Sequence, residues 1–568
     1  MVFVSIEMLR VLDEKLEEGW FSFKDFTKEL GDRALQVLLD MYCQGILSLR
    51  GSEEFLVTDA GRRLVLAWRT SGRPEANPWV DSRVFSMIES SVLAGGRVEE
   101  KWRSILEERG FTGESGELSP EAYEVYDTLL TTEKKLVVSK AMAGALVAIP
   151  EGPAENKWYD TKWLETFEAM GLIVRSAPNG KYIALTRSGR LLKRAFNQLN
   201  LDAPYTALLN ESIYKDILRV LNGERLDGEA RQRLGLIGYL SGTGSLTRAA
   251  SLVVLAWRYA SSPSPTLPTA LSSHEVRVLK RIVELWEKAK SNPELAPTRK
   301  RVVENLESSW DLKHYSVSLV LYQLEALGLI EEIPWEKGRI VLKLTPMGER
   351  VLRDCGRGSS VTAVRSLVEA DRGGSPDEEW ISKAIDESLL GSKGPTDCGR
   401  ALMKVSREAW RSLLVTGLEA LILRRMPERK SVQRSDLARS FPGSEEDVLF
   451  SLDKLESKGL VRTCLGGRMV ITELGLIMKQ ALIGAPTGVA TPVNPHVVKL
   501  LEAIRKLGTE DLARLANETK MDLDTLKTAL IIARAVKLIG RGGTLTREGE
   551  MVLEVISKLR ERAEHERT

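Results

Sequence analysis

The sequence predicts a mainly α-helical protein with small β-hairpins, an α+β class, built from six copies of one repeat in two related halves. A recurring order predicts the repeat: a helical run that ends at glycine, two short apolar runs around a polar turn, and a Thr-x-x-Gly motif that opens another helix. The length of 568 residues predicts several domains, because a typical domain has about 150 residues. A Ser/Pro-rich segment at 261–269 separates the two halves and is typical of an extended linker.

The clearest copy covers residues 316–352. Its first part has apolar residues at helical spacing, and Gly328 follows where a helix end favours a positive φ. Two short β-runs, 329–330 and 340–344, flank a turn, and Thr345 can cap the next helix. Helix, glycine, strand, turn, strand and capped helix form the back half of a winged helix-turn-helix.

Five further stretches follow the same order. A threonine opens the last helix in each copy because its hydroxyl satisfies a free N–H of the first turn. The glycine of Thr-x-x-Gly is present in five of the six copies, and Ala250 replaces it in the third. The other five copies are centred on Gly45, Gly171, Gly235, Gly459 and, in the sixth, Lys537 in place of glycine.

The distances between copies alternate between long and short in the same order in both halves, about 1–262 and 270–568. This order predicts an internal duplication of a three-unit half. Residues 81–96 resemble 377–394 in the placement of apolar residues, and Trp102-Arg-Ser resembles Trp410-Arg-Ser, so each half is also expected to contain a helical insert. The expected boundaries are 1–70, 121–200, 201–262, 271–356, 406–485 and 494–568 for the winged-helix units, 71–120 and 357–405 for the inserts, and 263–270 for the linker.

Composition limits the possible functions. Lys and Arg number 81 against 79 Asp and Glu, a net charge of +2, so nucleic-acid binding would depend on local basic patches. The N-terminus has no signal-peptide pattern, and the longest apolar run, 136–149, contains Lys140 and is shorter than the roughly 20 residues a bilayer requires. We therefore expect a cytoplasmic protein without a membrane partner.

The sequence contains no catalytic or metal-binding motif that we can assign. The four cysteines have no C-x-x-C spacing and are expected to be reduced, and the four histidines form no H-x-x-x-H, so no metal site is expected. The glycine-rich segments 242–247 and 540–543 lack the order of a phosphate-binding loop and are expected to be hairpin turns. We therefore expect no enzyme activity and no cofactor.

Nucleic-acid binding has better candidates, because a helix-turn-helix places the first residues of its second helix on the bases. In the fourth copy that helix begins near Lys313, and a basic run precedes it. The fifth copy opens its helix with acidic residues at 445–447, which would repel phosphates. The candidate nucleic-acid-binding residues are Arg299, Lys300, Arg301, Lys313, His314, Ser316, Lys527 and, at the sixth hairpin tip, Arg541.

Copy by copy, the Gly-Leu-Ile, strand and Leu-Thr-x-x-Gly pattern resembles the winged-helix superfamily, as in archaeal transcription regulators. The full arrangement is similar to a family of uncharacterised archaeal proteins described only as a domain of unknown function. This resemblance implies a fold and supplies no functional residues. Two functions stay open. One is a DNA-associated or transcription-related protein that binds double-stranded DNA. The other is a scaffold in a multi-subunit protein complex without direct DNA binding.

Overall fold

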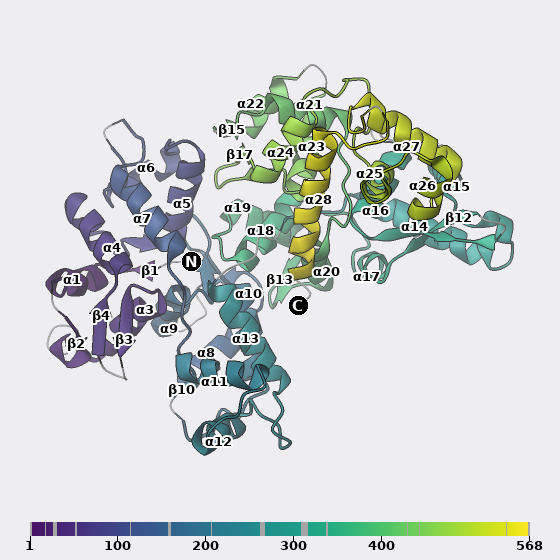
Figure 1. Cartoon of the computed structure of the whole chain (residues 1–568). Helices are drawn as coiled ribbons and strands as arrows, with labels where there is room; N and C mark the ends of the chain where they lie inside the picture. Colours follow the sequence, from purple (N-terminus) through teal and green to yellow (C-terminus); the bar gives the residue numbers. More distant parts are fainter. Residues whose placement is uncertain are drawn as a thin grey trace. The chain divides into compact units, whose positions relative to one another are not determined.

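The computed structural model describes residues 3–565, except 18, 27–30, 51–53, 114, 157–160, 206, 262–266, 308–315, 337–338, 429, 442–443 and 541. It is mainly helical with small antiparallel strand pairs, as the predicted α+β class requires (Figure 1). No helix among these residues is both long and apolar enough to cross a membrane.

The chain forms two compact lobes. Lobe 1 contains Met1–Pro265, Glu369–Ser382 and Leu390–Pro395, and lobe 2 contains Thr266–Val368, Lys383–Leu389 and Thr396–Thr568. The segment 369–382 thus joins lobe 1 although it comes from the second half of the sequence. Within lobe 1, Arg190 forms a buried ion pair with Asp371, and the N–H of Ala177 donates to the carbonyl of Pro376 at 3.0 Å.

The first half of the chain alternates short helices with strand pairs. Its helices are α1 (Ile6–Glu14), α3 (Ala34–Cys43), α4 (Asp59–Thr70), α5 (Ser82–Leu93), α6 (Glu100–Glu107), α7 (Pro120–Thr131), α8 (Lys140–Ala148), α9 (Thr161–Ala169), α10 (Arg187–Phe196), α11 (Glu211–Leu221), α12 (Gly228–Ile237) and α13 (Arg248–Ser261), with 3₁₀ turns η1 (Phe23–Phe26) and η2 (Gly31–Arg33). Its strands are β1 (Phe3–Val4), β2 (Phe21–Ser22), β3 (Leu47–Arg50), β4 (Glu54–Val57), β5 (Val80–Asp81), β6 (Val138–Ser139), β7 (Ala154–Glu155), β8 (Ile173–Arg175), β9 (Tyr182–Leu185) and β10 (Ala207–Leu209).

The second half follows the same plan. Its helices are α14 (Ser273–Ala289), α15 (Arg299–Glu307), α16 (Val317–Ala326), α17 (Pro346–Asp354), α18 (Val361–Arg372), α19 (Glu378–Asp386), α20 (Asp397–Glu408), α21 (Gly417–Arg425), α22 (Arg434–Arg439), α23 (Glu445–Ser457), α24 (Glu473–Ala481), α25 (Pro495–Leu507), α26 (Leu512–Thr519), α27 (Leu523–Ala535) and α28 (Arg547–His565), with the 3₁₀ turn η4 (Pro293–Leu295). Its strands are β11 (Ile330–Pro334), β12 (Ile340–Leu344), β13 (Leu390–Gly391), β14 (Gly394–Pro395), β15 (Val432–Gln433), β16 (Val461–Thr463) and β17 (Arg468–Ile471).

One local structure, which we call the junction, occurs eight times among the described residues. A helix ends at a residue with positive φ, a hairpin follows, and the hydroxyl of a Thr or Ser donates back to the carbonyl of that positive-φ residue at 2.6–3.1 Å. The same hydroxyl accepts the N–H three residues further on at 3.1–3.5 Å, which caps the next helix. The pairs of positive-φ and capping residues are Gly45/Thr58, Gly110/Ser119, Gly171/Thr186, Gly238/Thr247, Gly328/Thr345, Ser388/Thr396, Gly459/Thr472 and Lys537/Thr546.

The strand register at the junction is also constant. The residue two after the positive-φ residue pairs with the residue before the cap, as Leu47 does with Val57 and Leu240 with Leu246. The same pairing holds in the other six junctions. The repeats are therefore equivalent in backbone hydrogen bonding as well as in residue pattern.

Steric crowding explains why glycine occupies the last position of the Thr-x-x-Gly motif. A Cβ on Gly61 would press against the carbonyl oxygen of Ile46, the residue after the junction glycine, and Gly189, Gly348, Gly475 and Gly549 face equivalent carbonyls. Only a residue without Cβ allows the capped helix to approach the hairpin this closely.

Eight junctions replace the six copies expected from the sequence. The two additional junctions, at Gly110 and Ser388, lie in the segments 71–120 and 357–405, which were expected to be helical inserts. The third expected copy was centred on Gly235, but its positive-φ residue is Gly238, and Gly235 lies inside α12. The expected match of Trp102 with Trp410 is also wrong. Trp102 lies eight residues before Gly110, and the residue at the same distance before Ser388 is Trp380.

Two kinds of hairpin alternate along the chain. The cap lies 13, 15, 17 and 13 positions after the positive-φ residue in the first, third, fifth and seventh junctions, and 9, 9, 8 and 9 positions after it in the others. The order is long, short, long, short in each half. We call these long-hairpin and short-hairpin repeats.

One cysteine prediction is wrong. Cys355, at the end of α17, and Cys398, in α20, form a disulfide with a Cα–Cα distance of 4.8 Å. The pairing was not evident because 43 residues separate them and the packing of α17 on α20 brings them together. Cys43 and Cys464 are buried thiols outside this disulfide.

Candidate functional site

The helices that end at the junctions, here the junction helices, differ in exposure according to hairpin length. In the long-hairpin repeats they are α3, α9, α16 and α23, whose described side chains are buried or half-buried except Leu35, Glu445 and Glu446. In the short-hairpin repeats they are α6, α12, α19 and α27, and each has an exposed face. The exposed side chains are Glu100, Lys101, Ser104, Glu107, Glu229, Arg231, Gln232, Leu236, Glu379, Ser382, Lys383, Ile385, Asp386, Leu523, Asp524, Lys527, Thr528, Ile531, Arg534 and Ala535.

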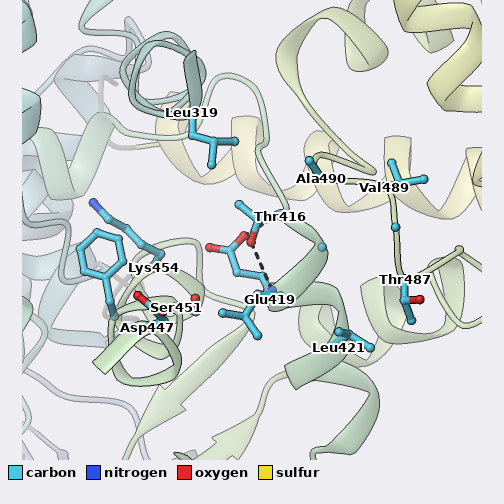
Figure 2. Close-up of a pocket in the computed structure, with 14 residues that line it drawn as sticks. Leu319, Thr416, Glu419, Leu421, Asp447, Ser451, Lys454, Thr487, Val489 and Ala490 are labelled. Atoms are coloured by element: carbon cyan, nitrogen blue, oxygen red, sulfur yellow. Dashed lines mark hydrogen bonds between the residues drawn. The ribbon is translucent and has the colours of Figure 1, made fainter. Parts of the chain in front are cut away.

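Each lobe has a cavity beside two buried junction helices. In lobe 2 a cavity of about 380 Å³ lies between α16, α21 and α23. Figure 2 shows Thr416 and Glu419 at the start of α21, near Lys454 of α23. Lys454 Nζ donates to Glu275 Oε1 at 2.7 Å, and Glu419 forms a buried ion pair with Lys458. The two buried lysines beside this cavity are therefore neutralised within the protein.

The cavity of lobe 1 has a volume of about 440 Å³ and lies between α3, α9 and the start of α8. Asp40 and Thr166 line it, each five residues before its junction glycine. The residues at those positions in the second half are Gln323 and Lys454. The two cavities therefore lie at equivalent places. At the position five residues before a junction glycine, lobe 1 contributes the carboxyl group of Asp40 and lobe 2 the ammonium group of Lys454.

The structure describes five of the eight predicted nucleic-acid-binding residues. Among these, Lys300, Ser316 and Lys527 are exposed, and Ser316 caps α16 by accepting the N–H of Leu319. Lys300 lies 3.7 Å from Glu304. Arg301 is half-buried, and Lys313, His314 and Arg541 lie outside the described residues.

Arg299 instead belongs to a network within lobe 2. Its Nη2 donates to Glu325 Oε2 at 2.6 Å and to Glu332 Oε1 at 3.1 Å. Its guanidinium carbon lies 4.6 Å from the ring centroid of Tyr322. The guanidinium of Arg299, which we predicted from the sequence to contact nucleic acid, is therefore paired with two carboxylates of the same chain.

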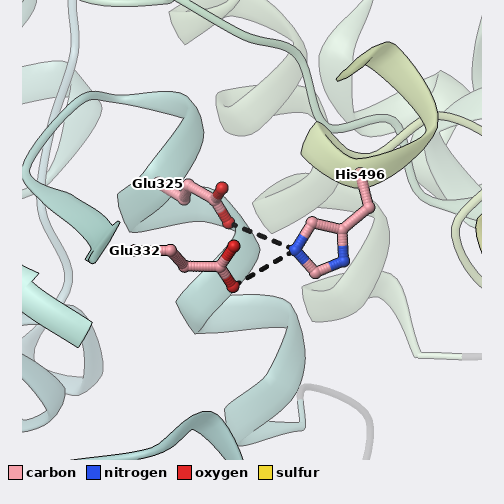
Figure 3. A group of neighbouring side chains, drawn as sticks. All are labelled: Glu325, Glu332 and His496. Carbon is pink, nitrogen blue, oxygen red and sulfur yellow. Dashed lines mark hydrogen bonds and ion pairs between the residues drawn. The ribbon is translucent and has the colours of Figure 1, made fainter. Parts of the chain in front are cut away.

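His496, on α25, completes this network (Figure 3). Its Nε2 lies 3.3 Å from Glu332 Oε1 and 4.0 Å from Glu325 Oε2. Lys499, one turn further along α25, places Nζ 3.0 Å from Glu325 Oε1. The network joins α15, α16 and β11 of one repeat to α25 of another.

The electrostatics of the network favour ion pairing over metal binding. Burial alone would raise the pKa of Glu332, but the hydrogen bond with His496 and the charges of Arg299 and Lys499 lower it below the ordinary value. Glu325, Glu332 and His496 have potential ligand atoms within 4.8 Å of one another. A divalent cation would add two charges to a site whose two carboxylates already pair with two cations, so the residues do not fit such an ion.

The first half has an equivalent link. Tyr42 lies three residues before Gly45, as Glu325 lies three before Gly328, and its hydroxyl donates to Glu211 Oε2 of α11 at 2.6 Å. Hydrogen bonds from Lys215 and Tyr42 lower the pKa of Glu211 to about 2. Polar groups therefore link equivalent helices in the two halves: α3 contacts α11 in the first half, and α16 contacts α25 in the second.

The sequence alone did not reveal this network or the cavities. His496 and Glu332 are 164 residues apart, and no spacing rule connects them. A detectable signal did exist for the network, because a glutamate occupies the third position before Gly171, Gly328 and Gly459. Each of these glutamates pairs with an arginine: Arg175, Arg299 and Arg365 respectively.

Comparisons with known proteins agree with the two halves. A family model described as "Protein of unknown function (DUF505)" matches residues 4–309 and again 303–556. An uncharacterized protein of Methanocaldococcus jannaschii is 24% identical over 553 residues, which cover 91% of this chain and 93% of that protein. No solved structure matches the chain.

Proposed function

The chain belongs to the family of proteins of unknown function that matches it in two tandem regions, and on this premise we propose that it is a protein-binding scaffold of eight winged-helix units. In this proposal each junction with its flanking helices is one unit. The long-hairpin units hold each lobe together through their junction helices. The short-hairpin units present theirs to partners in a multi-subunit assembly.

The alternation of buried and exposed junction helices supports this proposal most directly. In a DNA-binding winged helix, this helix must be free to enter the major groove. In α3, α9, α16 and α23 the described side chains are buried or half-buried, except Leu35, Glu445 and Glu446. Helices buried to this extent are poorly placed to enter a groove, which supports a structural role for half of the units.

The exposed helices also have the chemistry of protein-binding surfaces. Each of three carries large apolar side chains in water: Leu236 is 41% exposed, Ile385 46%, Leu523 51% and Ile531 69%. Helix α6 begins with Glu100, and α27 is capped by Asp522 and has Asp524 in its first turn. Carboxylates at these positions would face phosphates, whereas mixed charge around apolar residues suits a protein interface.

DNA binding through α27 is the second candidate function. Lys520, Lys527 and Lys537 are all exposed, before, within and after this helix. If α27 entered a groove, these three residues would supply the positive charge, and Lys527 would be the contact nearest the centre of the helix.

One set of variants separates the two functions. Tagged wild-type protein, Ile531→Asp and Ile483→Asp would be purified from cells of the source organism after nuclease treatment. Ile483 is 68% exposed but lies outside the junction helices, so it is the matched control. We expect wild type and Ile483→Asp to retain the same proteins in fixed stoichiometry and Ile531→Asp to lose them, because a central interface residue contributes about 2 kcal/mol or more.

The companion measurement is a fluorescence titration of the full chain with random duplex DNA at two salt concentrations. The scaffold proposal expects no steep salt dependence. Tight binding at low salt that falls steeply with salt and weakens in Lys527→Ala, without a stoichiometric protein partner, would establish the DNA function instead.

A further inference from the structure

The cavity of lobe 1 has the features of a binding site for a small molecule. Its wall is mostly apolar, with Leu35 and Leu39 from α3, Met142 from α8 and Trp163 from α9. Polar groups are few, and three of them, Gln36, Thr166 and Asp40, are linked by hydrogen bonds. Ligand sites typically combine an apolar wall with a small number of oriented polar groups.

Asp40 is the polar group that most needs a partner. Its side chain lines the cavity, and the residue is only 3% exposed. Oδ2 receives a long hydrogen bond from the hydroxyl of Thr166 at 3.5 Å, and Gln36 Nε2 donates to that hydroxyl at 3.0 Å. Among the described residues no donor reaches Oδ1. A buried carboxylate oxygen without a donor is energetically costly.

The surroundings do not neutralise Asp40. The pKa of Asp40 is raised to about 8, chiefly by burial and in smaller part by Glu165 of α9, although the hydrogen bond from Thr166 and the charge of Arg33 oppose the rise. The buried thiol of Cys43 lies one turn away on α3 and also interacts with Lys134 and Lys135. At pH 7 the carboxyl group of Asp40 is therefore mostly protonated, and a cation beside it would favour its ionised form.

The equivalent cavity indicates which ligand group fits. At the position of Thr166, the second half has Lys454, whose ammonium is buried beside the cavity of lobe 2. The fold thus accommodates an ammonium group at this place when a carboxylate is available to it. In lobe 1 the carboxylate is present on the opposite helix, and among the described residues no lysine pairs with it, because the buried ammonium of Lys134 lies beside Cys43 instead.

We propose that the cavity between α3 and α9 binds a small organic ammonium ion with an apolar body. The ammonium group contacts Oδ1 of Asp40, and the body packs on Leu39, Met142 and Trp163. The indole ring adds to the selection of a cation because the face of an aromatic ring attracts positive charge. A neutral hydrogen-bond acceptor would satisfy the protonated carboxyl group but would gain nothing from its ionisation.

Binding by this mechanism is coupled to proton release. The ammonium ion binds the carboxylate form, whose fraction rises from about one-tenth at pH 7 to about nine-tenths at pH 9 for a pKa of about 8. Aliphatic ammonium groups, with pKa values near 10, stay mostly charged over this range. Affinity therefore rises about tenfold from pH 7 to pH 9.

Calorimetric titration of the full chain tests the proposal, with tryptamine and hexylamine as probes and 3-methylindole and indole-3-propionate as neutral and anionic controls. We expect one site per chain for an ammonium probe, affinity about tenfold higher at pH 9 than at pH 7, and at least tenfold weaker binding of both controls. Titrations at pH 7 in buffers of different ionisation enthalpy should show the release of about one proton.

Two substitutions locate the site. Asp40→Asn preserves shape but removes the charge, and Thr166→Lys places an ammonium group from the protein beside Asp40, so each should weaken probe binding at least tenfold. Asp524→Asn, an exposed carboxylate in lobe 2, is the matched control and should bind like wild type. Failure of both ammonium probes to bind at pH 9, equal binding of 3-methylindole, or unchanged binding in Asp40→Asn would overturn the proposal.

Discussion

The cavity between α3 and α9 and the cavity between α16, α21 and α23 are equivalent places in two halves that have diverged in their charges. In lobe 2, Lys454 and Lys458 are buried and each pairs with a glutamate, Glu275 and Glu419 respectively. In lobe 1 the corresponding helices leave Asp40 without an ionic partner. The shape of the repeat was retained, while one cavity became internally neutral and the other kept an unmatched carboxyl group.

This difference shows how little sequence change separates a structural cavity from a binding cavity. One position, five residues before the junction glycine, carries Asp40, Thr166, Gln323 or Lys454, and all four residues are buried. The backbone places them alike, so their chemistry alone decides whether the site is self-sufficient. Three changes test that interpretation.

The largest effect on stability is expected when Lys454 of lobe 2 loses the negative charge of Glu275. Glu275→Gln leaves Lys454 buried without its counter-charge and should lower the free energy of unfolding of lobe 2 by about 3–5 kcal/mol. The glutamine still caps α14, so the loss reports the charge. Glu284→Gln, which removes an exposed ion pair with Arg281 on the same helix, is the control and should cost less than about 0.5 kcal/mol.

Hydrogen exchange with mass spectrometry locates the effect, because it reads the stability of segments separately. Protection of peptides from α14 and α23 should fall in Glu275→Gln and stay unchanged in Glu284→Gln. Equal protection in the two variants would show that the pair with Lys454 contributes no more than a surface pair.

The opposite result is expected in lobe 1. The pKa of Asp40 is raised from 3.8 to about 8 in the folded state, so its stabilising contribution is fully present below about pH 4 and is lost as pH rises through 8. Asp40→Asn removes this loss. The variant should match wild type at pH 4 and exceed its free energy of unfolding by roughly 4 kcal/mol at pH 7. Denaturant unfolding at the two pH values checks this, and a difference between the proteins that does not change with pH would contradict it.

A smaller difference between the lobes should appear on reduction. The disulfide between Cys355 and Cys398 lies in lobe 2, so a reductant should destabilise this lobe by about 2–4 kcal/mol and leave lobe 1 unchanged. Thiol titration of the denatured chain should find two thiols before reduction, Cys43 and Cys464, and four afterwards. Four thiols before reduction would show that the bond does not form.

The sequence predicted the local features that depend on neighbouring residues. Helix ends at Gly45 and Gly328, the capping role of Thr58 and Thr345, and the hairpins between them follow from backbone geometry and short-range hydrogen bonds. The repeat was therefore visible wherever its marker residues were typical. It was missed at Gly110, where Ser119 and Ala122 replace the threonine and glycine of Thr-x-x-Gly, and at Ser388, where serine replaces the junction glycine.

The features that depend on distant residues were not predictable in this way. Arg299 has the sequence context of a DNA-contacting residue, yet folding places Glu325 and Glu332 beside it, and its charge is used within the chain. Asp40 looks like an ordinary helix residue until α9 covers it. Whether a charged side chain is free or paired is decided by tertiary packing, which a single sequence does not encode in any fixed spacing.

The alternation of long and short hairpins also bears on the ancestry of the chain. A single doubling would explain two similar halves, but it would leave no regular order inside each half. The order long, short, long, short in both is what two successive doublings leave, the first joining two copies of a two-repeat ancestor and the second joining two copies of the product. The ancestral polypeptide would then have been a pair of unlike repeats, with the division between a covered helix and an open one already present.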